Sequence, residues 1–210
     1  MKEFPKLPWW VRPLVFVMCL PSILLGCANT DYTNARASVY LINTASGGNG
    51  SGVMIEPNLM LTAAHVAGDG TGLTVGPEKL PAKLLYVDKD NDIALLYVSL
   101  ECPCVSLADP PKPDVPVVII GFPINEHFHV QTVTEGLVQG RWENRLAMTA
   151  PASGGNSGGG VFVYQDGEWK LAGILVEVAG WCVGMACYPM AHLSRAVATE
   201  TMVLFLRRAL

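Results

Sequence analysis

One serine in this chain lies in a run of glycines, a pattern typical of a reactive residue. Ser157 is part of the segment 154–160, which contains five glycines. Glycines cost backbone entropy and cannot fill a core, so a local requirement must explain so many of them. A serine that attacks a carbonyl group needs an exposed hydroxyl on a tight turn and backbone N–H groups aimed at the developing oxyanion. The segment therefore predicts a nucleophile for acyl transfer, and a glycine-rich surface loop is the alternative.

A nucleophilic serine also requires a base and a group that orients the base. Of the four histidines, His65 follows an apolar run typical of a strand. Asp92 directly precedes another such run, which favours it over its neighbours Asp88 and Asp90. The sequence therefore predicts a triad in the chain order His65, Asp92, Ser157.

Two other interpretations of these segments are less consistent with the sequence. The glycine-x-serine-x-glycine pattern also occurs in α/β-hydrolases, but there the acid and the histidine follow the serine. The acids at 88, 90 and 92 are spaced like the start of a calcium loop, yet Ile93 stands where that loop requires glycine. The segment 47–52 looks like a second nucleophile loop, and we interpret it as structural. We expect no metal and no other cofactor.

The composition predicts a well-packed protein and disfavours a nucleic-acid partner. The chain has 210 residues, of which 50% are hydrophobic and 15% charged, so one domain or a tightly coupled pair is expected. The formal net charge is −4 and no basic cluster is present, which disfavours binding to nucleic acid.

Short apolar runs alternate with turn residues along the chain, which is typical of an all-β barrel or sandwich. A proline-rich stretch, 102–116, separates two sets of runs. The predicted strands are 39–43, 52–56, 59–62, 72–75, 82–87 and 93–98 in the first half, and 117–121, 130–140, 146–149, 160–164, 170–178 and 188–191 in the second. Beyond them, apolar residues at 193, 196, 197 and 204 are spaced for one face of a terminal helix.

The first residues predict an export signal. A basic leader precedes the apolar segment 13–25, which is too short for a comfortable transmembrane helix. The segment ends in Leu24-Leu25-Gly26-Cys27, which resembles a bacterial lipobox, where the signal is removed before a lipidated cysteine. Acyl chains such as palmitate on Cys27 would tether the chain to a membrane. Because Ala28 follows, we expect the outer membrane of the cell envelope, facing the periplasm. Plain secretion or an uncleaved anchor is the alternative.

Four cysteines remain outside this signal, an even number in an oxidising compartment. They are Cys102, Cys104, Cys182 and Cys187, and they allow three pairings. A disulfide between Cys182 and Cys187 would close a small loop and is the pairing we favour, with the others left open.

Three motifs together resemble the trypsin/chymotrypsin-like serine proteases, especially the bacterial HtrA-like and glutamyl-endopeptidase-like branches. They are Thr62-Ala63-Ala64-His65, Asp92-Ile93-Ala94-Leu95-Leu96 and Gly155-Asn156-Ser157-Gly158-Gly159. The resemblance implies an all-β fold of two six-stranded antiparallel barrels with a C-terminal α-helix. The expected domains are a signal peptide at 1–26, a tether at 27–37, barrels at 38–110 and 111–191, and a helix at 192–210.

The resemblance also implies roles for individual residues. Ser157 would be the nucleophile, His65 the base, Asp92 its orienting group, and the N–H groups of Gly155 and Ser157 the oxyanion hole. The implied function is a serine endopeptidase that acts on a peptide or protein substrate and is tethered to the envelope membrane through lipidated Cys27. The alternative is a catalytically silent, protease-like lipoprotein that binds peptides or an envelope partner. In the family's digestive members the position of Asn156 is Asp, which pairs with a newly cleaved N-terminal amine. Because Asn cannot form that ion pair, we expect no activating cleavage beyond signal removal.

The resemblance places a specificity pocket near Pro151 and Ala152, with one wall formed by the strand that contains Val176, Glu177 and Val178. No acid stands at the expected base, which disfavours cleavage after Arg or Lys. We expect a small or medium apolar residue before the scissile bond.

Overall fold

Buried apolar residues of the strands form the cores of two barrels in this computed structural model. The structure describes residues 31–101, 103–124, 130–183 and 186–210. The chain divides into two units, Met1–Tyr32 and Thr33–Leu210, and both barrels belong to the second.

The first barrel closes on itself with the strand order β1-β2-β3-β6-β5-β4. Closure pairs every strand on both sides and so removes unprotected sheet edges. Its interior is filled by large side chains that are fully buried, such as Ile42, Met54, Met60 and Leu95. The six strands are β1 (Val39–Asn43), β2 (Asn49–Glu56), β3 (Leu59–Thr62), β4 (Thr74–Val75), β5 (Leu80–Asp88) and β6 (Ile93–Val98).

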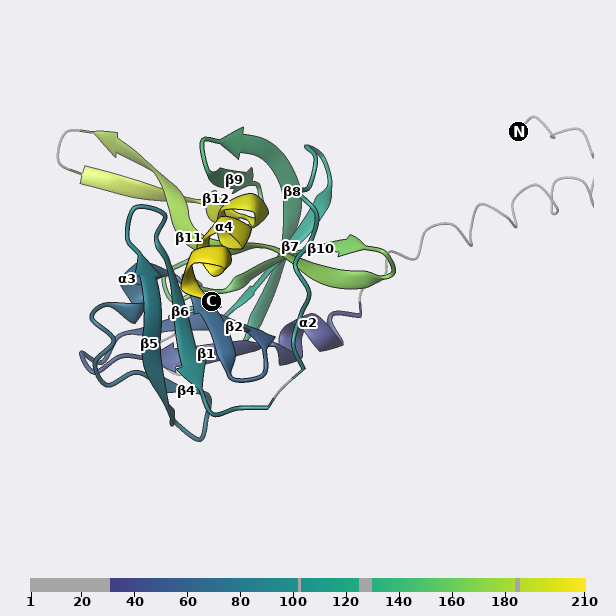
Figure 1. Ribbon diagram of the computed structural model, residues 1–210. Helices are drawn as coiled ribbons and strands as arrows, with labels where there is room; N and C mark the ends of the chain where they lie inside the picture. The colour runs from purple at the N-terminus through teal and green to yellow at the C-terminus, as the bar shows by residue number, and fades with distance from the viewer. Residues whose placement is uncertain (1–30, 102, 125–129, 184–185) are drawn as a thin grey trace, which may run out of the picture. The chain divides into compact units, whose positions relative to one another are not determined.

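The second barrel is also closed, with the strand order β10-β11-β12-β9-β8-β7. Its core includes Val138, Leu146, Val161 and Leu175. Figure 1 shows that the end of the β11–β12 hairpin extends beyond this barrel. The six strands are β7 (Pro116–Gly121), β8 (Thr132–Trp142), β9 (Arg145–Met148), β10 (Gly160–Gln165), β11 (Glu168–Val183) and β12 (Ala186–Ala198).

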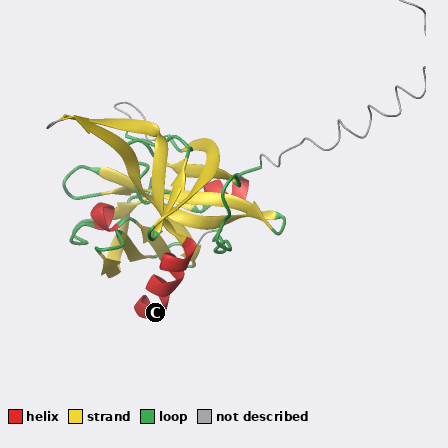
Figure 2. Ribbon diagram, turned by 90° about the horizontal axis from the view of Figure 1, so that it is seen from above, coloured by secondary structure: helices red, strands yellow, loops and turns green. Residues whose placement is uncertain are grey.

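The described part of the chain also contains three helices, which are red in Figure 2. They are α2 (Thr33–Ala37), α3 (Ala64–Ala67) and α4 (Thr199–Ala209). Met202 and Phe205 of helix α4 are buried. The centroid of the Phe205 ring lies 5.3 Å from that of the Tyr86 ring on β5. The C-terminal helix therefore packs against the first barrel as well as following the second. Among the described residues, no helix is long and apolar enough to cross a membrane.

The predicted fold class is confirmed, and every predicted strand corresponds to an observed one. The boundary between the second barrel and the terminal helix, expected after residue 191, was wrong. Strand β12 continues to Ala198, because its residues from Ser194 to Val197 pair with β9 and Ala196 and Val197 also pair with β11. The helix begins only at Thr199. The expected tether ends in helix α2, whose Ala35 is buried.

Candidate active site

His65 lies on α3, a single helical turn that follows β3 directly. Its Nδ1 atom is 2.7 Å from Oδ2 of Asp92, and its backbone N–H donates to Oδ1 of the same carboxylate at 2.9 Å. The His65 side chain is 48% exposed, whereas that of Asp92 is 23% exposed. The carboxylate of Asp92 thus contacts both the main chain and the ring of His65. The other ring nitrogen, Nε2, remains available for a different hydrogen bond.

Asp92 is presented by a tight turn between β5 and β6. Its φ of +50° lies in the left-handed region, which is uncommon for a residue other than glycine. Before it, Asp88 accepts hydrogen bonds from the backbone N–H of Asn91 at 3.0 Å and from its Nδ2 at 2.8 Å. Burial disfavours the charged form of Asp88, but these hydrogen bonds outweigh it and lower the pKa of Asp88 below its ordinary value.

The same turn is attached to the second barrel. Arg145, on β9, donates from Nη1 to the carbonyl oxygen of Asn91 at 2.8 Å. The side chain of Asn144 donates to Oδ1 of Asn91. Sequence reasoning missed these three residues, because no local motif indicates a contact between residues more than fifty positions apart.

Ser157 lies in the loop that joins β9 to β10, and its neighbouring glycines are required by close backbone contacts. Gly158 has a φ of +82°, and a Cβ atom there would lie 2.1 Å from the carbonyl oxygen of Ser51. Gly155 has a φ of +86°, and a Cβ atom there would lie 2.5 Å from the nitrogen of Ile124. Larger residues would therefore clash with main-chain atoms and force the loop to move.

Ser51 of the first barrel holds the loop around Ser157 in place by hydrogen bonds. Its Oγ donates to the carbonyl oxygen of Gly155 at 2.9 Å and accepts from the backbone N–H of Phe122 at 2.9 Å. Its own N–H donates to the carbonyl oxygen of Ser157 at 2.8 Å. The glycine-rich segment 47–52 is thus a support for the serine loop, and Ser51 is a residue that the sequence did not reveal.

A cavity of about 310 Å³ is lined by two of the three residues of the predicted triad. Both His65 and Ser157 line it, and so do Thr44, Ser46, Gly48, Asn49, Val66 and Gly155. Within the described part of the chain no hydrogen bond joins Ser157 to His65. Such bonds are often long in ligand-free active sites and tighten when substrate binds.

Two backbone donors are available beside Ser157. Among the described residues, the N–H groups of Gly155 and Ser157 have no hydrogen-bond acceptor, whereas those of Gly158 and Gly159 donate to Leu175 and Asn156. Because Gly155 and Ser157 both line the cavity, these two donors could bind an oxygen atom that acquires negative charge there.

The five residues of the predicted specificity pocket differ in their surroundings. Ala152 and Val176 are 5% and 8% exposed, and Val178 packs against the core of the second barrel. Pro151 is exposed, and so is Glu177. The Glu177 carboxylate lies 3.5 Å from Nη2 of Arg195.

Asn156 is buried, with 3% of its surface exposed. Among the described residues its Oδ1 atom has no hydrogen-bond partner, and a Cβ atom on Gly121 would lie 2.9 Å from it. The side chain therefore fills a narrow space under the serine loop and forms no ion pair.

Two predicted features lie at or beyond the limits of the description. The lipidation site Cys27 lies outside the described residues, as does Cys102. Cys182 and Cys187 face each other as Cα partners in the β11–β12 hairpin, but their side chains are outside the description, so their disulfide stays a prediction.

Comparison with known proteins assigns the chain to a family. Residues 50–174 match the family model of the trypsin-like peptidase domain. The chain therefore belongs to the trypsin-like peptidase family, which makes it a serine endopeptidase by class.

Solved structures show the same fold. An inactive form of Rv3671c from Mycobacterium tuberculosis H37Rv, a serine-to-alanine mutant, is similar with a TM-score of 0.70 and 20% identity, over 90% of this chain and 93% of that one. A second inactive form of the Rv3671c protease has a TM-score of 0.69 and 20% identity, over 86% and 93%. The serine endoprotease from Yersinia pestis has a TM-score of 0.69 and 24% identity, over 87% and 67%. The search of curated proteins gave no match.

Proposed function

We propose that this protein cleaves peptide bonds through an acyl-enzyme formed on Ser157. The observation that carries the proposal is the double hydrogen bond from His65 to Asp92 at 2.7 and 2.9 Å, on the wall of a cavity that Ser157 also lines. A histidine held in this way is restricted to one orientation and one tautomer. This restriction is what a general base for serine requires.

The proposed chemistry assigns one task to each group. Nε2 of His65 accepts the proton of the Ser157 hydroxyl while Oγ attacks the substrate carbonyl, and it then donates that proton to the leaving amine. Asp92 stabilises the imidazolium that forms in between. The N–H groups of Gly155 and Ser157 bind the oxyanion of the tetrahedral intermediate. Water repeats the sequence to release the acyl group.

The proposed substrate has a small or medium apolar residue before the scissile bond. Ala152, Val176 and Val178 are apolar, and the nearby carboxylate of Glu177 is paired with Arg195. This ion pair reduces the attraction that Glu177 would otherwise exert on a basic side chain. Profiling cleavage of a peptide library tests the preference, and a clear preference for Arg or Lys would contradict it.

An activated serine is tested by labelling the full chain with a fluorophosphonate probe. We expect the probe to label wild type and to label neither Ser157→Ala nor His65→Ala, with Ser106→Ala, on the exposed linker between the barrels, as a matched control that still reacts. No labelling of the folded wild-type chain would contradict the proposal and would favour a silent, peptide-binding protein.

We also propose that the protein is tethered to the bacterial envelope through acyl chains on Cys27. The support is the resemblance of 24–27 to a lipobox after a short apolar segment. Metabolic incorporation of a fatty-acid analogue should label the wild-type chain and should be abolished by Cys27→Ser. Labelling that persists in this variant would contradict the tether, and Cys104→Ser serves as the matched control.

A further inference from the structure

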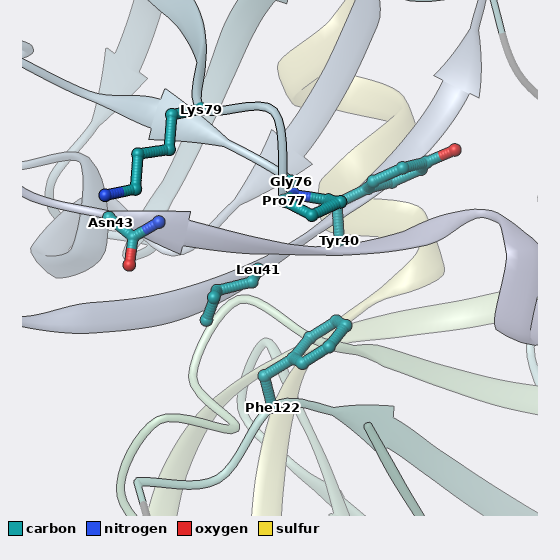
Figure 3. Close-up of a pocket in the computed structure, with 7 residues that line it drawn as sticks. All are labelled: Tyr40, Leu41, Asn43, Gly76, Pro77, Lys79 and Phe122. Atoms are coloured by element: carbon teal, nitrogen blue, oxygen red, sulfur yellow. The ribbon is translucent and has the colours of Figure 1, made fainter. Parts of the chain in front are cut away.

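A second cavity of about 510 Å³ lies beside the first barrel. Three of its residues come from β1, three from the turn between β4 and β5, and one from the segment after β7. They are Tyr40, Leu41, Asn43, Gly76, Pro77, Lys79 and Phe122 (Figure 3).

This cavity, which we call the Phe122 pocket, has an apolar part and a cationic end. In Figure 3 the side chains of Lys79 and Asn43 lie toward one end, and the rings of Tyr40 and Phe122 lie toward the other. Lys79 forms no ion pair within the described chain. Glu78 does not line the pocket, although its Oε2 atom lies 3.5 Å from the position that a Cβ atom on the lining residue Gly76 would take. A cation beside apolar surface, in a chain of net charge −4, favours a ligand that carries an apolar side chain and a carboxylate.

The wall that carries Lys79 is fixed by backbone hydrogen bonds. The N–H of Gly76 donates to the carbonyl oxygen of Leu41 at 2.9 Å, and the N–H of Lys79 donates to the carbonyl oxygen of Gly76 at 3.2 Å. Lys79 has a φ of +52°, a conformation that this short turn imposes on it. The pocket is therefore formed in the free protein, which reduces the entropy lost on binding.

The Phe122 pocket shares no lining residue with the active-site cavity, and Asn49 connects the two through its contacts. Asn49 lines the active-site cavity, and its Nδ2 donates to the carbonyl oxygen of Phe122 at 3.4 Å. Asn49 also faces Asn43, a residue of the Phe122 pocket, across β1 and β2. A peptide that leaves the active-site cavity along the β1–β2 turn would reach this pocket next.

The proposed function indicates which part of a peptide substrate would lie on each side of the active site. If β11 near Val176 accommodates the residue before the scissile bond, the β1–β2 turn remains for the part of the substrate after it. This assignment places the Phe122 pocket on the leaving-group side.

We infer that the Phe122 pocket binds substrate residues after the scissile bond, selecting an apolar side chain next to a carboxylate. The inference rests on the proposed function for the direction of the substrate. The apolar side chain packs against Phe122, Leu41 and Tyr40. The carboxylate pairs with the Lys79 ammonium and comes from an acidic side chain or from a peptide C-terminus, because both present the same group.

The test compares cleavage of peptides that share one segment before the scissile bond and differ only downstream. The downstream pair is Phe-Asp, Phe-Asn, Ala-Asp or Phe-Lys, placed at successive distances from the bond, with amidated ends. At one distance we expect kcat/KM for the Phe-Asp peptide to exceed that of the Ala-Asp and Phe-Asn peptides, about tenfold against Ala-Asp because an aromatic ring is buried. Lys79→Gln should remove the preference of Asp over Asn, and Lys79→Glu should favour the Phe-Lys peptide.

Lys83→Gln, on an exposed position of β5 outside the pocket, is the matched control and should keep the wild-type preference. A preference that is unchanged in both Lys79 variants overturns the inference. A preference for acid that Lys83→Gln also abolishes overturns it too, because the effect is then one of general charge. A free-acid peptide without Asp identifies the source of the carboxylate. If it responds to Lys79 the terminus is bound, and if only the amidated Phe-Asp peptide responds the side chain is bound.

A binding measurement separates failure of the inference from failure of the proposed function. Fluorescence anisotropy of the labelled Phe-Asp peptide is measured with the full-length Ser157→Ala chain, with and without Lys79→Gln. Binding that Lys79→Gln weakens supports the pocket even if the wild-type chain reacts with no probe. An active wild-type enzyme whose Ser157→Ala variant shows no Lys79-dependent binding overturns the pocket alone.

Discussion

At the residue scale, the position of His65 depends on one carboxylate. Asp92 bonds both Nδ1 and the backbone N–H of His65, so it fixes the helix turn as well as the ring. Asp92 belongs to the turn between β5 and β6 and has a left-handed backbone there, so this turn is part of the candidate active site.

We expect Asp92→Asn to lower kcat by about 10³–10⁴-fold, because an amide donor facing Nδ1 favours the wrong tautomer of His65. Asparagine tolerates the left-handed backbone conformation, so the unfolding free energy should change little. Peptide hydrolysis and urea unfolding measure the two effects. Asp90→Asn, two residues earlier and exposed, is the matched control. A fall of kcat that is as large in Asp90→Asn would show that charge rather than geometry is responsible.

The candidate triad could be proposed from the sequence for a physical reason. A nucleophile loop must contain glycines, as the contacts at Gly155 and Gly158 show, and glycine is visible without a structure. The sequence did not predict the roles of Asn91, Asn144 and Ser51. Their hydrogen bonds join segments that are far apart in the chain, and nothing local distinguishes them from other polar residues on turns.

At the element scale, the turn between β5 and β6 connects the chemistry to the fold. Its internal bonds from Asn91 to Asp88 shape it, and those from Asn144 and Arg145 attach it to the β8–β9 hairpin. The position of Asp92 is thus decided jointly by both barrels.

This turn should give stability a dependence on pH. The pKa of Asp88 is lower in the folded chain than in the unfolded chain, so the folded state binds its proton less readily. The stabilisation is present above the ordinary pKa of an aspartate, and it is lost as the pH falls through the folded pKa. We expect Asp88→Asn to reduce the unfolding free energy by up to about 1 kcal/mol at neutral pH and by less in acid.

Urea unfolding of wild type and Asp88→Asn, across the acidic range and at neutral pH, measures this difference. Asp114→Asn is a control at an exposed acid with a similarly left-handed backbone. A difference between wild type and Asp88→Asn that is constant with pH would show that shape rather than charge matters at residue 88.

Elements were predicted from the sequence better than their ends were. The spacing of Leu193, Ala196 and Val197 suits a helix, yet these residues belong to β12. Pairing with β9 and β11 decides their conformation, because closing the barrel outweighs local periodicity. The residue at which α4 begins is therefore set by pairing between strands, which the spacing of apolar residues does not reveal.

At the scale of the whole molecule, Ser51 joins the barrels under the nucleophile. Its Oγ bonds Gly155 and Phe122, and its N–H bonds Ser157. We expect Ser51→Ala to lower the unfolding free energy by about 1–3 kcal/mol, because it leaves the buried carbonyl of Gly155 and the partly buried N–H of Phe122 without this partner. We expect kcat to fall more than KM changes, because the N–H of Gly155 loses its fixed direction.

Thermal unfolding and steady-state kinetics on one peptide measure these two effects. Thr62→Val is informative beside it, since Thr62 Oγ1 bonds the carbonyl of Ser51 at 2.7 Å without touching the serine loop's own carbonyls. It should cost stability with a smaller effect on kcat. Equal losses of kcat in both variants would contradict a specific role for the Ser51 hydroxyl.

The Ser51 contact also means that the proposed catalytic centre lies at the interface between the two barrels. His65 and Asp92 come from one barrel and Ser157 from the other, so neither half holds a working set of groups. The rate of peptide hydrolysis should therefore depend on the packing of the two barrels against each other as well as on the catalytic groups. On gradual heating, activity would disappear when the halves separate, while each barrel still retains its strands.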